Sequence, residues 1–304
     1  MNRAPPAPSE QHRQGYAFGL AAYGLWGVLP IYFKQLTSIP STDIVIHRIL
    51  WSLPLLALLL TLTGHWRQVR SAVQDRKTLG LLIVTAVLIA GNWLLYVYAV
   101  NSGRILAGSL GYYLNPLANV LLGWLILKEK LSRLQWVAVL VAAAGIAPLA
   151  LQAIDQLWIS LTLCFSFATY GLLRKIATVD AVAGLTVETA MLLPFTLAWL
   201  GWDLAAGTTP FGTTTRETIL LLLAGLVSTT PLLLFTGAAR RIPYSTLGML
   251  QFLAPTLQFL IAVGLYGEKF TPTHAIAFGA IWAALALYVA AIFRSARASV
   301  TLPE

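Results

Sequence analysis

Residues 111–130 read GYYLNPLANVLLGWLILKEK, an apolar run that contains an Asn-Pro pair and a second Asn and closes on Glu-Lys. A similar stretch begins 139 residues later, where residues 250–269 read LQFLAPTLQFLIAVGLYGEK. At this offset Pro116 matches Pro255, and the two Glu-Lys pairs also match. A match at about half the chain length predicts that the two halves of the protein are repeats of one unit.

The composition is that of a membrane protein. Of the 304 residues, 58% are hydrophobic and 10% are charged, and the mean hydropathy is +0.76, far outside the range of soluble domains. A helix needs about 20 apolar residues to cross the bilayer core. Ten stretches have about this length, at 15–34, 44–63, 79–100, 105–127, 134–152, 157–175, 184–202, 218–239, 245–266 and 275–293. We therefore predict an all-α polytopic membrane protein with ten transmembrane helices.

The segments at the two ends are short. Residues 1–14 are polar and Pro-rich, and the first span ends in IYFK rather than in a small-residue cleavage site, which indicates a retained helix and not a secretory signal. We expect a disordered N-terminal tail at 1–14. A first five-helix repeat follows at 15–152, a second at 153–293 and a C-terminal tail at 294–304.

The basic residues are distributed unevenly about the spans. If the N-terminus is cytoplasmic, fifteen Lys and Arg residues lie in cytoplasmic segments and four lie on the opposite side, which is a strong positive-inside bias. The fifteen are Arg3, Arg13, Arg67, Arg70, Arg76, Lys77, Lys128, Lys130, Arg133, Arg174, Lys175, Arg240, Arg241, Arg294 and Arg297, and the four are Lys34, Arg104, Arg216 and Lys269. We therefore expect both termini in the cytoplasm, and we attribute the net charge of +9 to topology rather than to nucleic-acid binding.

Each predicted repeat has five spans. Because five is odd, the second repeat enters the membrane from the opposite face, and inverted repeats of this kind are typical of secondary transporters. Two further offsets support the relation between the halves. A shift of 140 aligns Arg48 with Glu188, and a shift of 147 aligns Tyr-Gly-Leu at 23–25 with Tyr-Gly-Leu at 170–172.

Helix-start signals occur at matching places in the two halves. Ser132 with Gln135 forms a capping box ahead of the fifth span, and Thr271 followed by Pro272 is an N-cap with Pro at the first helical position of the tenth. The Glu-Lys pairs precede these starts. We interpret them as loop charges whose Glu favours the N-terminus of the next helix, not as a site.

A polar face on the fourth span matches a polar face on the ninth. An unpaired amide is costly in hydrocarbon, so such residues face the bundle interior or a wet cavity. Each Pro also removes a main-chain hydrogen bond and bends its helix. We predict a substrate path lined from both halves by Tyr112, Asn115, Pro116, Asn119, Gln251, Pro255 and Gln258. The alternative is that Asn and Gln join helices and Pro only kinks them.

Aromatic residues within other spans extend this candidate path. Amphipathic rings in a pore lining can offer both stacking and a hydrogen bond, whereas the alternative is interfacial belts or simple packing. The candidates are Tyr23 and Trp26 in the first span, Asn92, Trp93 and Tyr96 in the third, and Tyr170, the repeat partner of Tyr23.

Two charged residues lie within spans. A charge inside the membrane is a functional hypothesis, yet both residues are near enough to an interface to snorkel or to pair locally. Arg48 is a candidate for either a structural anchor or a site, and Glu188 is a candidate proton or substrate group.

Signatures of enzymes and nucleotide-driven pumps are absent from the sequence. G-x-x-x-x-G-K-[ST] does not occur, since residues 207–215 lack the Lys, and HExxH does not occur. The single Cys, Cys164, excludes an internal disulfide. Asn115-Pro116-Leu117 resembles a water-channel motif, but its repeat partner lacks the Asn. We expect no enzyme activity, no cofactor and no metal site, since the His residues are scattered at 12, 47, 65 and 274.

Seven stretches together carry a family resemblance: AYGLWGVLPIYFK at 22–34, HRILWS at 47–52, GNWLLYVYAVN at 91–101, SLGYYLNPLANVLLG at 109–123, SFATYGLLRK at 166–175, ETAMLLP at 188–194 and residues 251–269. With them the sequence resembles the RarD-type branch of the EamA drug/metabolite transporters from about residue 15 to 293. It implies ten helices in two inverted five-helix repeats, the inner membrane of a bacterium, and alternating access. It also implies a cavity lined by spans one, three, four, six, eight and nine. Members are commonly labelled chloramphenicol-sensitivity permeases, which leaves the physiological substrate open.

We therefore predict a secondary transporter of a small polar or amphipathic metabolite or drug, with export favoured over import. A facilitator or channel, a lipid flippase and a structural membrane partner stay open as alternatives. The expected partners are a small-molecule substrate and the lipid bilayer, and candidate further partners are a proton as coupling ion and a second copy of the chain.

Overall fold

The computed structural model describes residues 8–102, 104–267 and 270–300, and every regular element within these ranges is a helix. Nine segments of this described chain are long and apolar enough to cross a membrane. The protein is therefore a polytopic α-helical membrane protein. Its elements are α1 (Pro8–Phe33), η1 (Lys34–Leu36), α2 (Ser41–Thr63), α3 (Trp66–Gln74), α4 (Arg76–Asn101), α5 (Ile105–Leu125), α6 (Arg133–Gln152), η2 (Ile154–Gln156), α7 (Leu157–Ile176), α8 (Ala181–Ala206), α9 (Thr215–Ala239), α10 (Tyr244–Gln251), α11 (Leu253–Gly264) and α12 (Pro272–Val300). Arg3 and the Glu-Lys pair at 268–269 lie outside the described residues.

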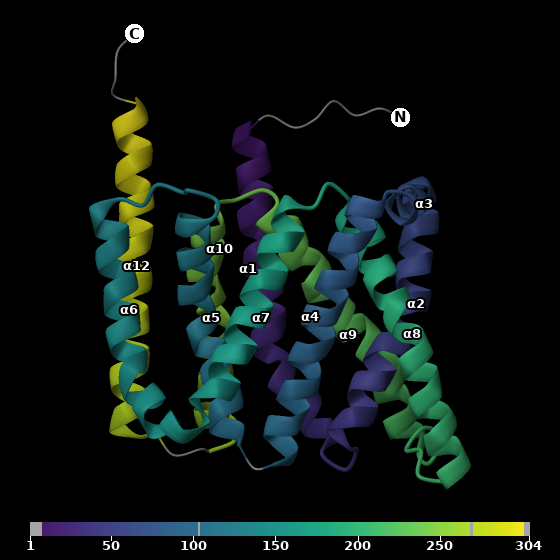
Figure 1. Cartoon of the computed structure of the whole chain (residues 1–304). Helices are drawn as coiled ribbons and strands as arrows, with labels where there is room; N and C mark the ends of the chain where they lie inside the picture. The colour runs from purple at the N-terminus through teal and green to yellow at the C-terminus, as the bar shows by residue number, and fades with distance from the viewer. Residues whose placement is uncertain (1–7, 103, 268–269, 301–304) are drawn as a thin grey trace.

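The long helices stand side by side, and the short helix α3 lies at one end of the bundle (Figure 1). We call this end the α3 face. Helix α1 begins there and α12 ends there, and the connections α5–α6, α7–α8 and α9–α10 lie at the same face. The connections α1–α2, α4–α5, α6–α7 and α8–α9 lie at the opposite face. The segments richest in Lys and Arg therefore share one end of the molecule.

Most of the extensive helix contacts join the first half of the chain to the second. Helix α6 packs along α12, α5 along α7 and α10, α1 along α9 and α11, and α2 along α8 and α9. A glycine permits one close approach, since a side chain at Gly248 of α10 would lie 2.7 Å from the carbonyl oxygen of Pro116 in α5. The two halves thus form one bundle, and a space at its centre is lined by both.

The helices at the two ends of the chain are longer than predicted. Helix α1 begins at Pro8, inside the segment expected to be disordered, and α12 continues to Val300, beyond the expected end at 293. Pro at the first position has a suitable φ and lacks only an N–H that would be unpaired there, and the following Gln and Arg favour helix. The connection at 64–78 also contains a helix, α3, which was not expected.

The predicted capping signals are confirmed. Ser132 and Gln135 form the complete capping box of α6, and the hydroxyl of Thr271 accepts a hydrogen bond from the backbone N–H of His274, 3.3 Å away, at the start of α12. The predicted ninth span is divided at Phe252 into α10 and α11. This break lies where the ring of Pro255 opposes the carbonyl four residues earlier. Helix α5 continues through Pro116.

Candidate substrate cavity

A cavity of about 250 Å³ lies within the bundle. Its wall comes from the second half of α1, the first half of α2, the last third of α4, the first half of α5, the middle of α7 and α9, and the α10–α11 break. The cavity therefore extends from the middle of the bundle towards the face opposite α3. The lining helices include all those that the family resemblance implied, and α2 in addition.

Nine of the thirteen predicted pathway residues line this cavity, together with Arg48. The nine are Tyr23, Trp26, Asn92, Trp93, Tyr96, Tyr112, Gln251, Pro255 and Gln258. They come from α1, α4, α5, α10 and α11, which are distant in the sequence and meet only through packing.

The other four predicted pathway residues lie outside the cavity wall. Asn119 faces α10, because Gly248 lets that helix approach α5 closely, at the backbone carbonyl of Pro116. The amide nitrogen of Asn119 donates to the Oε1 atom of Gln251 over 2.8 Å, which joins the two helices. Asn115 is fully buried, and neither of its side-chain amide atoms has a hydrogen-bond partner among the described residues. Tyr170 is fully buried in the neighbouring core. For Asn119 the geometry matches the alternative that amide groups join helices.

Aromatic rings form much of the cavity wall. Trp26 lies between Tyr23 and Phe167, with ring centroids 5.7 and 5.8 Å away, and Tyr96 meets Tyr112 edge to face at 5.5 Å. Such pairs hold one another in fixed orientations. The wall is thus rigid and mostly apolar.

The amide side chains of the wall are bonded to the protein. Asn92 of α4 donates to the carbonyl of Leu163 over 2.8 Å and to the hydroxyl of Ser166 over 2.9 Å, both in α7. Gln258 of α11 donates to the carbonyl of Trp26 over 3.0 Å. These bonds tie the second half of the chain to the first around the cavity.

Arg48 lines the cavity from α2, a helix that the family resemblance did not include. Its guanidinium lies over the ring of Trp93, 4.7 Å from the ring centroid. Its Nε atom is buried without a hydrogen-bond partner, and no ion pair within 4 Å involves Arg48 in the described parts of the chain. Val45, one turn earlier on α2, also lines the cavity. The spacing of three residues puts Val45 and Arg48 on the same helical face, and this spacing is the signal in the sequence that the face points inward.

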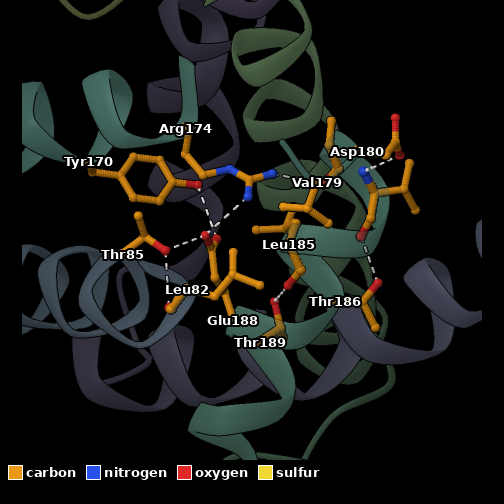
Figure 2. A network of polar contacts seen from close by, with 12 residues as sticks. Leu82, Thr85, Tyr170, Arg174, Val179, Asp180, Leu185, Thr186, Glu188 and Thr189 are labelled. Carbon is orange, nitrogen blue, oxygen red and sulfur yellow. Dashed lines mark hydrogen bonds and ion pairs between the residues drawn. The ribbon is translucent and has the colours of Figure 1, made fainter. Parts of the chain in front are cut away.

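Glu188 lies away from the cavity wall in a buried polar network (Figure 2). Its Oε1 atom accepts from the Thr85 hydroxyl over 2.6 Å and lies 3.4 Å from the Nη1 atom of Arg174, while Oε2 accepts from the Tyr170 hydroxyl over 3.4 Å. Arg174 and Glu188 are almost completely inaccessible, at 0% and 1%. A side chain at Gly184 would collide with the Arg174 guanidinium, so Gly184 leaves the space that this pair needs.

The structure adds a partner to Arg174, which we counted among the basic residues of the cytoplasmic segments. Arg174 lies in the last turn of α7, where it is buried between helices, and its Nη2 atom donates to the Ala181 carbonyl over 3.1 Å. Arg174 lies four residues after Tyr170 and therefore on the same helical face. This spacing was the signal in the sequence that Arg174 points into the bundle. Arg48 and Glu188, although equivalent by repeat offset, belong to different sites.

The structure also corrects the interpretation of Glu129. Its carboxylate caps α10 in the other half of the chain rather than α6, accepting from the backbone N–H groups of Tyr244 over 2.6 Å and Ser245 over 2.8 Å. Nearby, the Lys175 ammonium donates to the carbonyls of Ala239 and Ile242, each over 2.7 Å. These contacts join the α5–α6 connection and the end of α7 to the α9–α10 connection at the α3 face.

No group of three or more His, Cys, Asp or Glu side chains within residues 8–102, 104–267 and 270–300 is placed to hold a metal ion. The one Cys, Cys164, is buried. The described cavity wall offers one cation, amides, hydroxyls and aromatic faces.

Comparison with known proteins identifies the family. The model of the EamA-like transporter family matches residues 13–151. Protein RarD of Escherichia coli is 41% identical over 300 residues, which cover 96% of this chain and 99% of the relative. The chain belongs to the RarD-type branch of the EamA family.

Further relatives of this RarD-type transporter are bacterial. An uncharacterized transporter of Pseudomonas aeruginosa is 46% identical and covers 94% of this chain and 96% of its own length. A chloramphenicol-sensitive protein RarD of the same organism is 34% identical, and the match covers 90% of this chain and 93% of the relative. A solved crystal structure with 17% identity superposes with a TM-score of 0.73, covering 91% of this chain and 97% of that chain, which shows the fold alone.

Proposed function

We propose that this RarD-type transporter moves a small polar or amphipathic metabolite or drug by alternating access through the described cavity. The observation that carries the proposal is that the cavity extends from mid-bundle to one face and ends against packed residues on the other side. Ile242, Tyr244 and Leu247 at the α3 end are 0–1% exposed. A continuously open channel would need a path through this layer, so transport requires the two halves to move.

The proposal includes the two inverted repeats. Helices α1, α2, α4, α5 and α6 form the first five spans within residues 15–152, and α7, α8, α9, α10 with α11, and α12 form the second five within 153–293. The matched capping signals of α6 and α12 support this assignment. The two repeats contact each other around the cavity, so each can move as a rigid body against the other.

The proposal also includes orientation in the bacterial inner membrane. The bias of fifteen basic residues against four supports an orientation with the α3 face, both termini and the two tails in the cytoplasm. The cavity then faces outwards, and the α3 end is the closed cytoplasmic side. Reporters fused after Lys130 and after Lys269 test this topology: the first should read cytoplasmic and the second external. Two reporters on the same side would contradict the inverted repeat.

Glu188 is the proposed site of proton coupling. It is buried beside the cavity rather than in it, and Tyr170 connects the two places, because its hydroxyl donates to Glu188 and its ring packs 6.1 Å from that of Phe167 in the cavity wall. A change of charge at Glu188 would alter its attraction to Arg174 and hence the polar contact that joins α7 to α8.

The decisive experiment is transport in proteoliposomes, using candidates from a metabolite comparison of cells that lack and cells that overproduce the protein. Coupled transport predicts accumulation that depends steeply on an imposed pH gradient. Equal downhill flux with and without the gradient would indicate a facilitator, and movement of labelled lipid would indicate a flippase. In Glu188→Gln, gradient-driven accumulation should disappear while downhill exchange persists, and unchanged accumulation would remove Glu188 from the mechanism.

A further inference from the structure

Among the described residues, Arg48 is the only charged side chain in the cavity wall. Asp43, the acidic residue nearest to it along α2, is engaged elsewhere, because its Oδ1 atom accepts from the Trp199 indole over 3.3 Å. The guanidinium instead lies over the ring of Trp93, a contact that holds the cation without neutralising it. An enclosed cation without a counterion is costly, so this arrangement favours an anion that arrives with a ligand.

The guanidinium also has the donor geometry that an anion needs. Its N–H groups form a planar fork that matches the two oxygens of a carboxylate. The ring of Tyr23 is also in the wall, and its hydroxyl is buried without a hydrogen-bond partner among the described residues.

Amide groups of the wall make contacts with the protein. The amide nitrogens of Asn92 and Gln258 donate to protein acceptors, and Oε1 of Gln251 accepts from Asn119. The rest of the wall is aromatic or aliphatic, apart from the hydroxyls of Ser109 and of the Tyr side chains. The cavity thus offers one strong point of attraction, a cation, within a mostly apolar enclosure.

We propose that the cavity binds a small monocarboxylate whose remaining body is apolar or aromatic, with the carboxylate on Arg48 and the body against the aromatic wall. A single Arg balances one negative charge, whereas a phosphate carries about −1.5 to −2. A cationic ligand would be repelled, and a neutral one would leave Arg48 uncompensated. The cavity volume of about 250 Å³ suits a small molecule. This inference deepens the proposed function, on which the role of the site in transport rests.

The test uses purified full-length protein and a panel of matched probes. Monocarboxylates with aromatic, cyclic and straight-chain bodies, including 3-phenylpropanoate, are each compared with the neutral amide, the amine and the phosphate of the same body. Binding is measured by isothermal titration calorimetry. The variants are Arg48→Gln, Arg48→Lys and, as a control, Lys34→Gln, which removes an exposed cation at the same end of the bundle. Size-exclusion chromatography and unfolding temperature verify that each variant is folded.

We expect at least one carboxylate to bind about tenfold or more tightly than its amide and amine, a preference that Arg48→Gln abolishes and Lys34→Gln leaves unchanged. Arg48→Lys should keep part of it, because the charge remains but the bidentate geometry does not. The proposal is overturned if no carboxylate exceeds its amide, if phosphates bind best, or if folded Arg48→Gln keeps the preference. If Arg48→Gln does not fold, the carboxylate preference of wild type is compared with that of Arg48→Lys. An undiminished preference in Arg48→Lys would overturn the proposal.

The two proposals fail in distinguishable ways. Carboxylates that bind through Arg48 but do not cross the membrane of proteoliposomes would contradict transport and leave the binding inference standing. Transport of neutral or cationic compounds at an unchanged rate in Arg48→Gln would contradict the inference and leave the transporter standing.

Discussion

The two ends of the bundle bury polar groups in different ways. Towards the α3 face, Glu188 has Arg174, Thr85 and Tyr170, Glu129 has two backbone N–H groups, and Lys175 has two carbonyls. Towards the opposite face, the Arg48 guanidinium has the Trp93 ring and no ion pair among the described residues.

The difference separates polar groups that hold the structure from a polar group that is available to a ligand. A partnered buried group loses much of its binding energy to its neighbours and fixes the helices that carry it. An enclosed cation without a counterion leaves its electrostatic attraction to be satisfied from outside. The α3 end therefore has the properties of a closed gate, and the opposite end has those of a binding site.

The largest expected effect comes from deleting one member of the buried pair. Glu188→Ala leaves Arg174 enclosed without its counterion, which we expect to lower the free energy of unfolding by about 3–5 kcal/mol. Arg48→Ala removes no ion-pair partner, so its effect on stability should be much smaller. Thermal unfolding in detergent measures both.

A paired substitution sharpens this test. Replacing both members, as Glu188→Gln with Arg174→Gln, removes the unbalanced charge and should recover much of the lost stability. Equal destabilisation by Arg48→Ala and Glu188→Ala would show that the two ends do not differ as described.

The next effect concerns the contact between Glu129 and α10. Glu129→Gln replaces two charge-assisted hydrogen bonds with weaker ones, and such bonds contribute about 1.5–3 kcal/mol. The α3 end should then open more often. A Cys at position 247, which is 0% exposed in this state, should react with a maleimide about tenfold faster in a Cys164→Ala background, since 1.4 kcal/mol corresponds to a factor of ten.

Lys130→Gln is the matched control, because Lys130 is an exposed charge on the same connection. It should leave the labelling rate at position 247 unchanged. An equal rate in wild type and Glu129→Gln would show that the cap does not hold the α3 end closed.

A smaller contrast is expected between positions inside and outside the cavity wall. In Cys164→Ala, Cys at 112, 251 or 258 should react with small water-soluble thiol reagents, and Cys at 119 should react far more slowly, because Asn119 is 0% exposed and faces α10. Positions 121 and 260, on exposed outer surfaces of α5 and α11, should be unreactive in the bilayer, where a thiolate does not form. Rapid labelling at 119 with none at 112 or 251 would place the path on the other side of α5.

The smallest effect is expected at an exposed helix cap on the α3 face. Hydrogen bonds from Thr78 hold the pKa of Asp75, the N-cap of α4, below its ordinary value. A carboxyl with a depressed pKa stabilises the fold above its unfolded pKa, near 3.9, and this stabilisation is lost as the pH falls through the folded value. The unfolding temperature of wild type should therefore fall slightly more between pH 6 and pH 3 than that of Asp75→Asn, and identical profiles would contradict this role.

Local patterns in the sequence determined the class of the protein and much of its cavity. Hydropathy and helix capping depend on neighbouring residues, so the membrane class and the starts of α6 and α12 could be predicted. The aromatic and amide residues of α1, α4 and α11 could also be identified as inward-facing, since an exposed amide in lipid is costly.

Only the tertiary structure decided which polar groups meet. The repeat offset related Arg48 to Glu188, yet helix packing gave Glu188 to Arg174 and left Arg48 against Trp93 in the cavity. Likewise Glu129 precedes α6 in the sequence but caps α10. Glu188 and Thr85, like Glu129 and Tyr244, are more than 100 residues apart in the sequence. Which buried groups become partners therefore depends on how whole helix surfaces pack, not on any local pattern of residues.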